Sequence, residues 1–172
     1  MLFELDILCP EDLESYKRDM QEAFQKGAEA ELTELDTETE AEILPEEDIN
    51  RSLTAEGAAA YKAMLNGEIV GGAIVVIDES ARKGHLDFLY VKHSTQSKGI
   101  GKMIWQAIEE KYPDIQVWET VTPHFEKRNI HFYINKCGFS AVEFFNPYHS
   151  SCDTSENTER EECFFRLKKV MG

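Results

Sequence analysis

The chain has 172 residues, of which 42% are hydrophobic and 30% charged, and its 33 acidic and 18 basic residues leave a net charge of −15. This composition is typical of a folded globular protein, and the length suits one domain, so we predict a single domain over residues 1–172. The sequence contains no apolar run near 20 residues, so no membrane-spanning helix is expected. The negative charge would repel nucleic-acid phosphates and anionic membrane surfaces, so neither is expected as a partner.

The N-terminus carries no basic stretch and no small-residue cleavage site, so we expect no signal peptide and predict a cytoplasmic protein. The four cysteines form no CxxC pair and are expected to be reduced thiols: Cys9, Cys137, Cys152 and Cys163. Cys152 and Cys163 could face each other across a late loop, although a disulfide is not expected. The histidines have no metal-ligand spacing with cysteines or acids, so no metal is predicted.

The N-terminal segment predicts a strand followed by a helix. Residues 3–8 alternate as a strand does, and Pro10 suits the first turn of a helix. One apolar stripe at spacings of three and four residues follows, made of Leu13, Tyr16, Met20 and Phe24. This helix is expected to end near Gly27.

Residues 29–48 contain ten acidic residues and no basic one. Such a run is typical of a solvated loop or helix face, and it could also attract a cationic amine to a neighbouring site. Both interpretations remain open.

A hairpin is predicted next, because residues 58–65 and 68–78 read as strands on either side of Asn66-Gly67, a strong two-residue turn signal. The pair Gly71-Gly72 suggests a bulge or a close backbone approach. The later predicted elements are a strand at 86–91, a helix beginning near residue 100 and ending before Pro113, a strand at 115–121, a helix at 125–137 capped by Gly138, a strand at 141–145, a loop at 147–161 and a strand at 163–170. The order β-α-loop-β-β-β-α-β-α-β-β predicts an α/β protein with a mixed sheet flanked by helices.

The turn before the helix near residue 100 is the most informative segment. Gly99 and Gly101 let the backbone come close to a ligand, and the first helical turn offers unpaired N–H groups at a positive dipole end. That arrangement suits a pyrophosphate, and Lys98 and Lys102 could add positive charge. The turn could also do no more than start the helix.

Two common phosphate motifs are excluded by the residues at this turn. In the Walker A pattern Gln96 would have to be glycine, and Met103 would have to be serine or threonine. The dinucleotide fingerprint needs a glycine where Ile104 stands.

The run Gln96-Ser97-Lys98-Gly99-Ile100-Gly101 resembles the (Gln/Arg)-x-x-Gly-x-(Gly/Ala) motif of the GNAT acyltransferases, which bind acetyl-coenzyme A. Val91 lies five residues before Gln96, as the end of the fourth strand does in that superfamily. The hairpin around Asn66-Gly67 resembles its second and third strands, and the helix ending in Gly138-Phe139 resembles its final helix. The resemblance covers nearly the whole chain.

The resemblance implies a mixed, mostly antiparallel sheet that splays between its fourth and fifth strands. It places the N–H of Leu89 at the thioester carbonyl, as an oxyanion-type donor, and the N–H of Val91 on the pantetheine arm. The residues it implies for coenzyme binding are Leu89, Tyr90, Val91, Gln96, Ser97, Lys98, Gly99, Ile100, Gly101, Lys102 and Asn129.

Three residues are candidate acid or base groups on two strands, namely His85, Asp87 and Glu119. Side chains alternate along a strand, so His85, Asp87 and Leu89 are expected to share one face. Histidine suits proton transfer near neutral pH, and the resemblance implies acid or base roles at the positions of His85 and Asp87. Alternatively, His85 is an exposed strand-edge residue and Asp87 a buried hydrogen-bond acceptor. Glu119, among apolar neighbours, is a further candidate or faces solvent.

Tyr133 is the candidate general acid. In the superfamily the helix tyrosine usually lies four residues before the glycine of Gly-Phe, whereas Tyr133 lies five before Gly138 and Ile134 takes the usual place. Either the extra residue lies in the helix cap, or Tyr133 packs in the core. Asn129 lies closer to the tyrosine than the usual asparagine does.

The sequence therefore predicts an acetyl-coenzyme A-dependent N-acetyltransferase that acts by direct transfer to a primary amine in a ternary complex. The acceptor is expected to be a small cationic amine, and a polyamine, an aminoglycoside-like compound, an amino acid or a protein amine would all fit. The protein is expected to be a monomer or a homodimer. The alternative is a non-catalytic acyl-coenzyme A sensor on the same fold.

Overall fold

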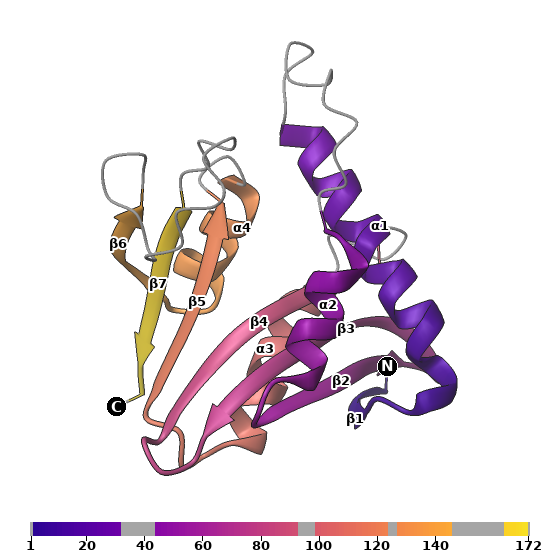
Figure 1. The fold of residues 1–172 in the computed structure, drawn as a ribbon, viewed down its shortest axis with the longest axis horizontal. Coiled ribbons are helices and arrows are strands. Elements are labelled where there is room, and N and C mark those ends of the chain that lie inside the picture. Colours follow the sequence, from indigo (N-terminus) through magenta and orange to yellow (C-terminus); the bar gives the residue numbers. More distant parts are fainter. Residues whose placement is uncertain (1, 32–43, 93–98, 124–126, 146–163, 172) are drawn as a thin grey trace.

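A computed structural model describes residues 2–31, 44–92, 99–123, 127–145 and 164–171. Its strands form one seven-stranded sheet in the order β1-β2-β3-β4-β5-β7-β6 (Figure 1). The strands are β1 (Phe3–Ile7), β2 (Ala58–Leu65), β3 (Glu68–Asp78), β4 (Lys83–Val91), β5 (Val117–Pro123), β6 (Ser140–Phe145) and β7 (Phe164–Val170). Neighbouring strands are antiparallel except for β4 and β5, which are parallel. The predicted α/β class and mixed sheet are confirmed.

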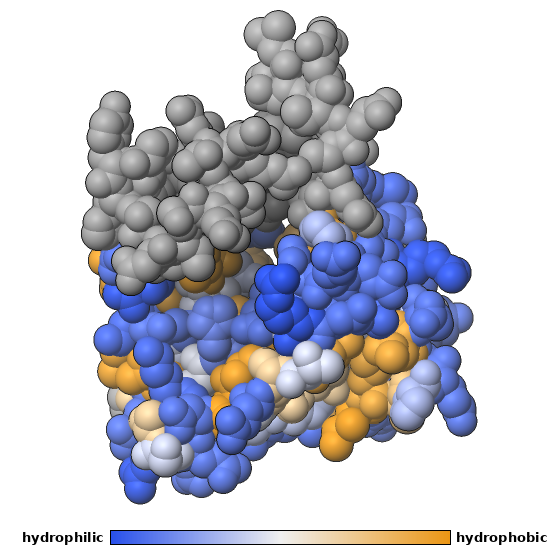
Figure 2. All heavy atoms as spheres, viewed as in Figure 1, coloured by the Kyte–Doolittle hydropathy of each residue, from blue (hydrophilic) through white to orange (hydrophobic). Residues whose placement is uncertain are grey.

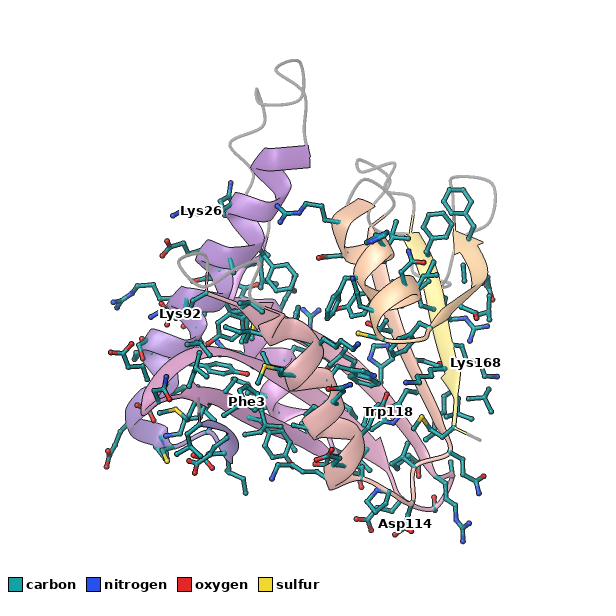
Figure 3. All side chains as sticks on the ribbon, turned by 180° about the vertical axis from the view of Figure 1, so that it is seen from behind. Phe3, Lys26, Lys92, Asp114, Trp118 and Lys168 are labelled. Atoms are coloured by element: carbon teal, nitrogen blue, oxygen red, sulfur yellow. The ribbon has the colours of Figure 1, made fainter. Side chains whose placement is uncertain are left out.

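Helices cover both faces of this sheet. They are η1 (Pro10–Asp12), α1 (Leu13–Glu31), α2 (Glu46–Thr54), α3 (Ile100–Lys111), α4 (Lys127–His131) and the π-helical segment η4 (Phe132–Lys136). The helices α1 and α2 lie on one face, and α3 and α4 lie on the other (Figures 1 and 3). Figure 2 shows that the outer surface over α1 and α2 is mostly hydrophilic.

Each face has its own buried cluster. The α3-side core includes Ile104, Trp105 and Trp118, with the two indole rings 5.1 Å apart. Figure 3 shows Trp118 beside α3. The α1-side core includes Tyr16 and Ile74 and packs α1 and α2 onto β2, β3 and β4. A strand residue can therefore be assigned to a face by the core that it joins.

The hairpin of β2 and β3 is confirmed with its predicted bounds. Asn66 and Gly67 have φ of 52° and 86°, which is the geometry that a two-residue hairpin turn requires. The pair Gly71-Gly72 shows both expected features. The register shifts by one residue beside Gly71, and a Cβ on Gly72 would lie 2.5 Å from the Tyr16 ring.

Several boundaries differ from the prediction. The helix α1 continues past Gly27 to Glu31, since one glycine costs a helix only about 1 kcal/mol and strong helix formers flank it, Lys26 before it and Ala28 after it. The helix α2 was not predicted, because its nine residues carry few apolar side chains and begin inside the acidic run. The strand β4 begins at Lys83 rather than at residue 86.

The predicted loop at 147–161, together with Cys152 and Cys163, lies outside the described residues. Of the other two cysteines, Cys9 is exposed and Cys137 is buried. Within the part of the chain that the structure describes, no helix is long and apolar enough to cross a membrane.

Candidate active site

The strands β4 and β5 part soon after they begin. In the described residues they pair at three positions, Lys83 with Val117, Gly84 with Trp118 and His85 with Glu119. One residue further on, where the ladder has ended, the carbonyl of Leu86 accepts a hydrogen bond from the side chain of Thr120, with Oγ1 at 2.8 Å. Beyond it the two strands diverge (Figure 1). The splay expected between the fourth and fifth strands is confirmed.

A β-bulge lies in β4 where the strands part. Leu86 pairs with Val75 of β3, but the next pair along the ladder is Phe88 with Ile74, which leaves Asp87 as the extra residue. A bulge changes which face the following side chains occupy. Leu86 belongs to the α3-side core, whereas Phe88 packs against the α1-side core.

The bulge makes one prediction wrong. His85 and Asp87 do lie on the same face, because their side chains are hydrogen-bonded to each other. Leu89 does not share this face, since it packs against the α3-side core. Strict alternation fails here because the bulge inserts one residue into the strand.

The same bulge directs backbone amides toward the side of β4 where β5 diverges beyond His85 and Glu119, a region called the opening below. The N–H of Lys92 donates to the carbonyl of Val70 on β3 at 2.8 Å. Because amide directions alternate along a strand, the N–H of Tyr90 also points toward β3, and those of Leu89 and Val91 point to the side that β5 has left. Those are the two amides expected to contact the coenzyme.

The side chain of Tyr90 is buried, with 2% of its surface exposed. Its ring lies edge-on to Tyr16 at 5.3 Å within the α1-side core. Burial raises the pKa of Tyr90, and its hydroxyl has no hydrogen-bond partner in the described structure. The Tyr90 side chain therefore packs in the α1-side core.

Three side chains form a hydrogen-bonded chain at the foot of the opening. Asp87 Oδ1 lies 2.6 Å from His85 Nδ1, and Ser52 Oγ donates to Asp87 Oδ2 at 2.6 Å. An ionised carboxylate can only accept, so this contact favours the neutral imidazole tautomer that carries its proton on Nδ1 and presents the lone pair of Nε2. The His85 side chain is 39% exposed, so this nitrogen can meet a substrate.

Glu119 stands beside His85 in the register but has different partners. Its carboxylate lies 2.8 Å from Arg166 Nη1 and 3.1 Å from Lys83 Nζ, and Arg166 also binds Glu143 at 3.1 Å. Glu119 is only 8% exposed. A buried carboxylate needs such partners, and Glu119 has two cations within ion-pair distance.

The turn before α3 has the geometry that a phosphate site needs. Gly99 is left-handed, with φ of 73°, and α3 begins at the next residue, Ile100. The first turn of a helix has N–H groups without acceptors inside the helix, so the amides of Ile100, Gly101 and Lys102 can bind an anion.

Gly101 also lets α3 pack closely, since a Cβ there would lie 3.0 Å from the Phe132 ring. The residues Gln96, Ser97 and Lys98 lie outside the described residues.

The helix that carries Tyr133 ends in a π-helical turn. The N–H of Cys137 donates to the carbonyl of Phe132, five residues back, and the N–H of Phe139 donates to the carbonyl of Tyr133. A π-turn holds one residue more than an α-turn. The extra residue between Tyr133 and Gly138 is therefore taken up within the helix itself.

Tyr133 is buried in the α3-side core, the cluster against which Leu89 and Val91 pack. Its ring lies 5.3 Å from Phe132 and 5.7 Å from Phe139. Asn129 lies half-buried on α4, one helical turn earlier.

Sequence reasoning missed two residues of the site. Ser52 belongs to α2, which the sequence pattern does not reveal. Arg166 lies in the predicted last strand, but its contact with Glu119 comes from the pairing of β5 with β7. Neither residue carries a local signal. Among the described residues, no group of three histidine, cysteine or acidic side chains is arranged to hold a metal ion.

Comparison with known proteins places this geometry in a family. The model of the Acetyltransferase (GNAT) family matches residues 13–139. The chain belongs to this family. It is 40% identical over 174 residues to Uncharacterized protein YrkN of Bacillus subtilis (strain 168), covering 97% of this chain and 92% of that protein.

Solved structures show the same fold. The ribosomal-protein-S18-alanine N-acetyltransferase from Escherichia coli superposes with a TM-score of 0.71 at 14% identity, over 99% of this chain and 95% of that one. The PaiA N-acetyltransferase from Thermoplasma acidophilum, solved in complex with coenzyme A, gives a TM-score of 0.66 at 21% identity, over 99% of this chain and 100% of that one. At these identities the likeness concerns the fold.

Proposed function

We propose that this GNAT acetyltransferase moves the acetyl group of acetyl-coenzyme A directly to a primary amine. The observation that carries the proposal is the meeting of three features where β4 leaves β5. These are the amides of Leu89 and Val91 that point away from β3, the N-terminus of α3, and the hydrogen-bonded pair of His85 and Asp87.

The first two features suit the coenzyme. The amides at the start of α3 would hold its pyrophosphate, and the Val91 N–H its pantetheine arm. The Leu89 N–H would donate to the thioester carbonyl, whose oxygen gains negative charge during the reaction. The coenzyme A complex of the Thermoplasma acidophilum relative supports a ligand of this kind on the same fold.

The third feature suits the removal of a proton from the acceptor. The amine nitrogen bonds to the carbonyl carbon, the carbon–sulfur bond breaks, and the amine proton passes to Nε2 of His85. His85 and Leu89 are four positions apart, and a strand rises about 3.3 Å per residue, so the backbone of His85 lies at most about 13 Å from the Leu89 amide. We place one water molecule between the amine and the imidazole.

The leaving thiolate needs a proton, and we assign its donor as Tyr133. This assignment is supported by the π-turn, which accommodates the extra residue, and by the core that Tyr133 shares with Leu89 and Val91. Since the buried Glu119 carboxylate is paired with Lys83 and Arg166, we assign it to charge balance beside His85 rather than to proton transfer.

A cationic amine is the proposed acceptor. The net charge of −15 favours the approach of cations over anions. The helix α2, which contributes Ser52 to the site, also begins with three acidic residues, Glu46, Glu47 and Asp48.

The test is acetyl transfer, measured as release of free thiol from acetyl-coenzyme A with polyamines, amino acids, aminoglycosides and basic peptides in turn. We expect release with one amine class. His85→Ala should lower kcat by about 100-fold or more, since general-base catalysis contributes 10²–10⁴-fold, and should leave the KM for acetyl-coenzyme A near its original value. His131→Ala is the matched control, because His131 is an exposed histidine on α4 to which no role in proton transfer is assigned. Tyr133→Phe keeps the ring in the core and should lower kcat alone.

Binding is measured separately by thermal unfolding with coenzyme A. A ligand at 100 times its Kd adds about 2.7 kcal/mol of stability, which raises the midpoint by roughly 5–11 °C for a chain of this size. Stabilisation without thiol release from any acceptor would favour a sensor, and the absence of stabilisation would contradict the proposal.

A further inference from the structure

We propose that Ser52 is a positioning residue for the catalytic base. Its hydroxyl holds the Asp87 carboxylate, and Asp87 in turn keeps the His85 proton on Nδ1 and leaves Nε2 free. The inference rests on the proposed role of His85 as the base. It assigns a function to α2, a helix that contributes no other side chain to the described site.

The order of the three groups defines the role of the serine. In a nucleophilic triad the histidine lies between the serine and the acid. Here the acid lies in the middle, with Ser52 Oγ and His85 Nδ1 each 2.6 Å from one oxygen of Asp87. The hydroxyl donates its proton to a carboxylate, so Ser52 is not activated as a nucleophile and acts through Asp87.

Ser52 departs from the usual behaviour of a serine within a helix. Such hydroxyls commonly bond to a carbonyl of the preceding turn. Thr54, two residues later on the same helix, does this with the carbonyl of Asn50 at 2.9 Å. Ser52 instead reaches from α2 to β4 and is only 6% exposed. The contact joins two elements that are distant in sequence.

The helix that supplies the hydroxyl is well anchored. Ile49 is completely buried in the α1-side core, and Leu53 packs against the same core. Lys17 of α1 binds Glu46 of α2 at 3.2 Å. A hydroxyl on a packed helix holds its partner in one orientation better than a mobile group could. Asp87 is thereby fixed from two sides, by β4 and by α2.

The consequence concerns the imidazole tautomer. An Asp87 carboxylate that is free to rotate would bind Nδ1–H less firmly, and the imidazole would more often carry its proton on Nε2. In that form Nε2 cannot accept a proton from the amine. Ser52 would therefore raise the fraction of the protein that is ready to react.

The first experiment reads this tautomer without an acceptor. Histidine labelled with ¹⁵N in its ring is observed by NMR, and the His85 signals are assigned from their loss in His85→Gln. We expect the Nδ1–H form in the original protein. In Ser52→Ala we expect the ratio of Nδ1–H to Nε2–H to fall by about tenfold, the equivalent of one hydrogen bond. Thr54→Ala removes a hydroxyl from the same helix and should leave the ratio unchanged.

The second experiment is a double-mutant cycle measured by kcat, with Ser52→Ala and Asp87→Asn alone and together. If Ser52 acts through Asp87, Ser52→Ala lowers kcat by about tenfold alone and has no further effect on Asp87→Asn. The KM for acetyl-coenzyme A should not change. An equal loss in both backgrounds would overturn the inference.

The outcomes separate this inference from the proposed function. Normal turnover by His85→Ala would remove the base assignment, whatever the tautomer. An unchanged tautomer in Ser52→Ala would overturn the role of Ser52 even if His85 proves essential. If Ser52→Ala fails to fold, Ser52→Cys replaces it, because cysteine is similar in size and a much weaker donor. An unaltered tautomer in that variant would likewise overturn the inference.

Discussion

Replacing Gly72 by alanine tests how tightly α1 is packed onto the sheet. A Cβ at this position would lie 2.5 Å from Tyr16 Cε2, 2.9 Å from Tyr16 Oη and 2.6 Å from the backbone carbonyl oxygen of Tyr61. Tyr16 is completely buried, and its hydroxyl donates to that same carbonyl at 3.1 Å. The added methyl group therefore displaces a buried ring and separates the two partners of a buried hydrogen bond.

The magnitude follows from these two effects. Overpacking in a core costs about 1–3 kcal/mol, and a buried polar group left without its partner costs about 1–3 kcal/mol more. We therefore expect Gly72→Ala to lower the free energy of unfolding by about 2–6 kcal/mol. For a chain of this length 1 kcal/mol corresponds to about 2–4 °C, so the midpoint should fall by at least about 4 °C.

The assay is urea unfolding followed by tryptophan fluorescence, with two further variants. Gly67→Ala is the control for backbone strain alone, since Gly67 has φ of 86° and open space around it. It should cost about 1–2 kcal/mol. Tyr16→Phe removes the hydroxyl, so Gly72→Ala should cost about 1–3 kcal/mol less in that background. The reasoning is refuted if Gly72→Ala destabilises the protein no more than Gly67→Ala does.

Two other predictions concern buried charge and burial of a thiol. Among the described residues, Arg166→Ala leaves Glu119 with Lys83 as its remaining ion-pair partner, and we expect urea unfolding to show a loss of about 1–3 kcal/mol, against less than about 1 kcal/mol for Glu143→Gln. Burial raises the pKa of the Cys137 thiol to about 12, whereas an unfolded thiol ionises near pH 8.5. The stability gained from burying the neutral thiol is therefore fully present below about pH 8.5. It is lost at about 1.4 kcal/mol per pH unit as the pH rises toward 12. Between about pH 8 and pH 10, the original protein should lose about 1–2 kcal/mol more than Cys137→Ala does, and equal slopes would contradict this.

The elements with strong local signals were predictable. The Asn66-Gly67 turn has one favoured geometry, so the hairpin could be placed with its bounds. The glycine-rich turn also marks the start of α3, because Gly99 adopts a positive φ directly before the helix. These features depend on a few adjacent residues, and the sequence contains all the information they need.

The missed features depend on contacts between distant residues. The helix α2 is short, and tertiary packing of Ile49 stabilises it more than its own propensity does. The π-turn at Tyr133 makes the five-residue spacing to Gly138 compatible with a continuous helix, which the spacing alone does not show. The bulge at Asp87 depends on the register between β3 and β4. One step along β3, from Val75 to Ile74, corresponds to two steps along β4, from Leu86 to Phe88.

The bulge accounts both for the failed prediction about the face of Leu89 and for the direction of the Leu89 amide. Leu86 belongs to the α3-side core and turns its carbonyl toward β5, whereas Lys92 contacts Asp19 of α1 and turns its amide toward β3. In β4, residues whose side chains lie on the α3 side thus direct their backbone N–H and C=O groups toward β5, and residues whose side chains lie on the α1 side direct them toward β3. Without the bulge, the Leu89 side chain would lie on the α1 side with His85, and its N–H would donate a hydrogen bond to β3. The extra residue moves the Leu89 side chain to the other face and, by the same shift, turns its N–H toward the opening. In this strand, Leu89 can therefore either point its N–H toward the opening or share a face with His85, but not both.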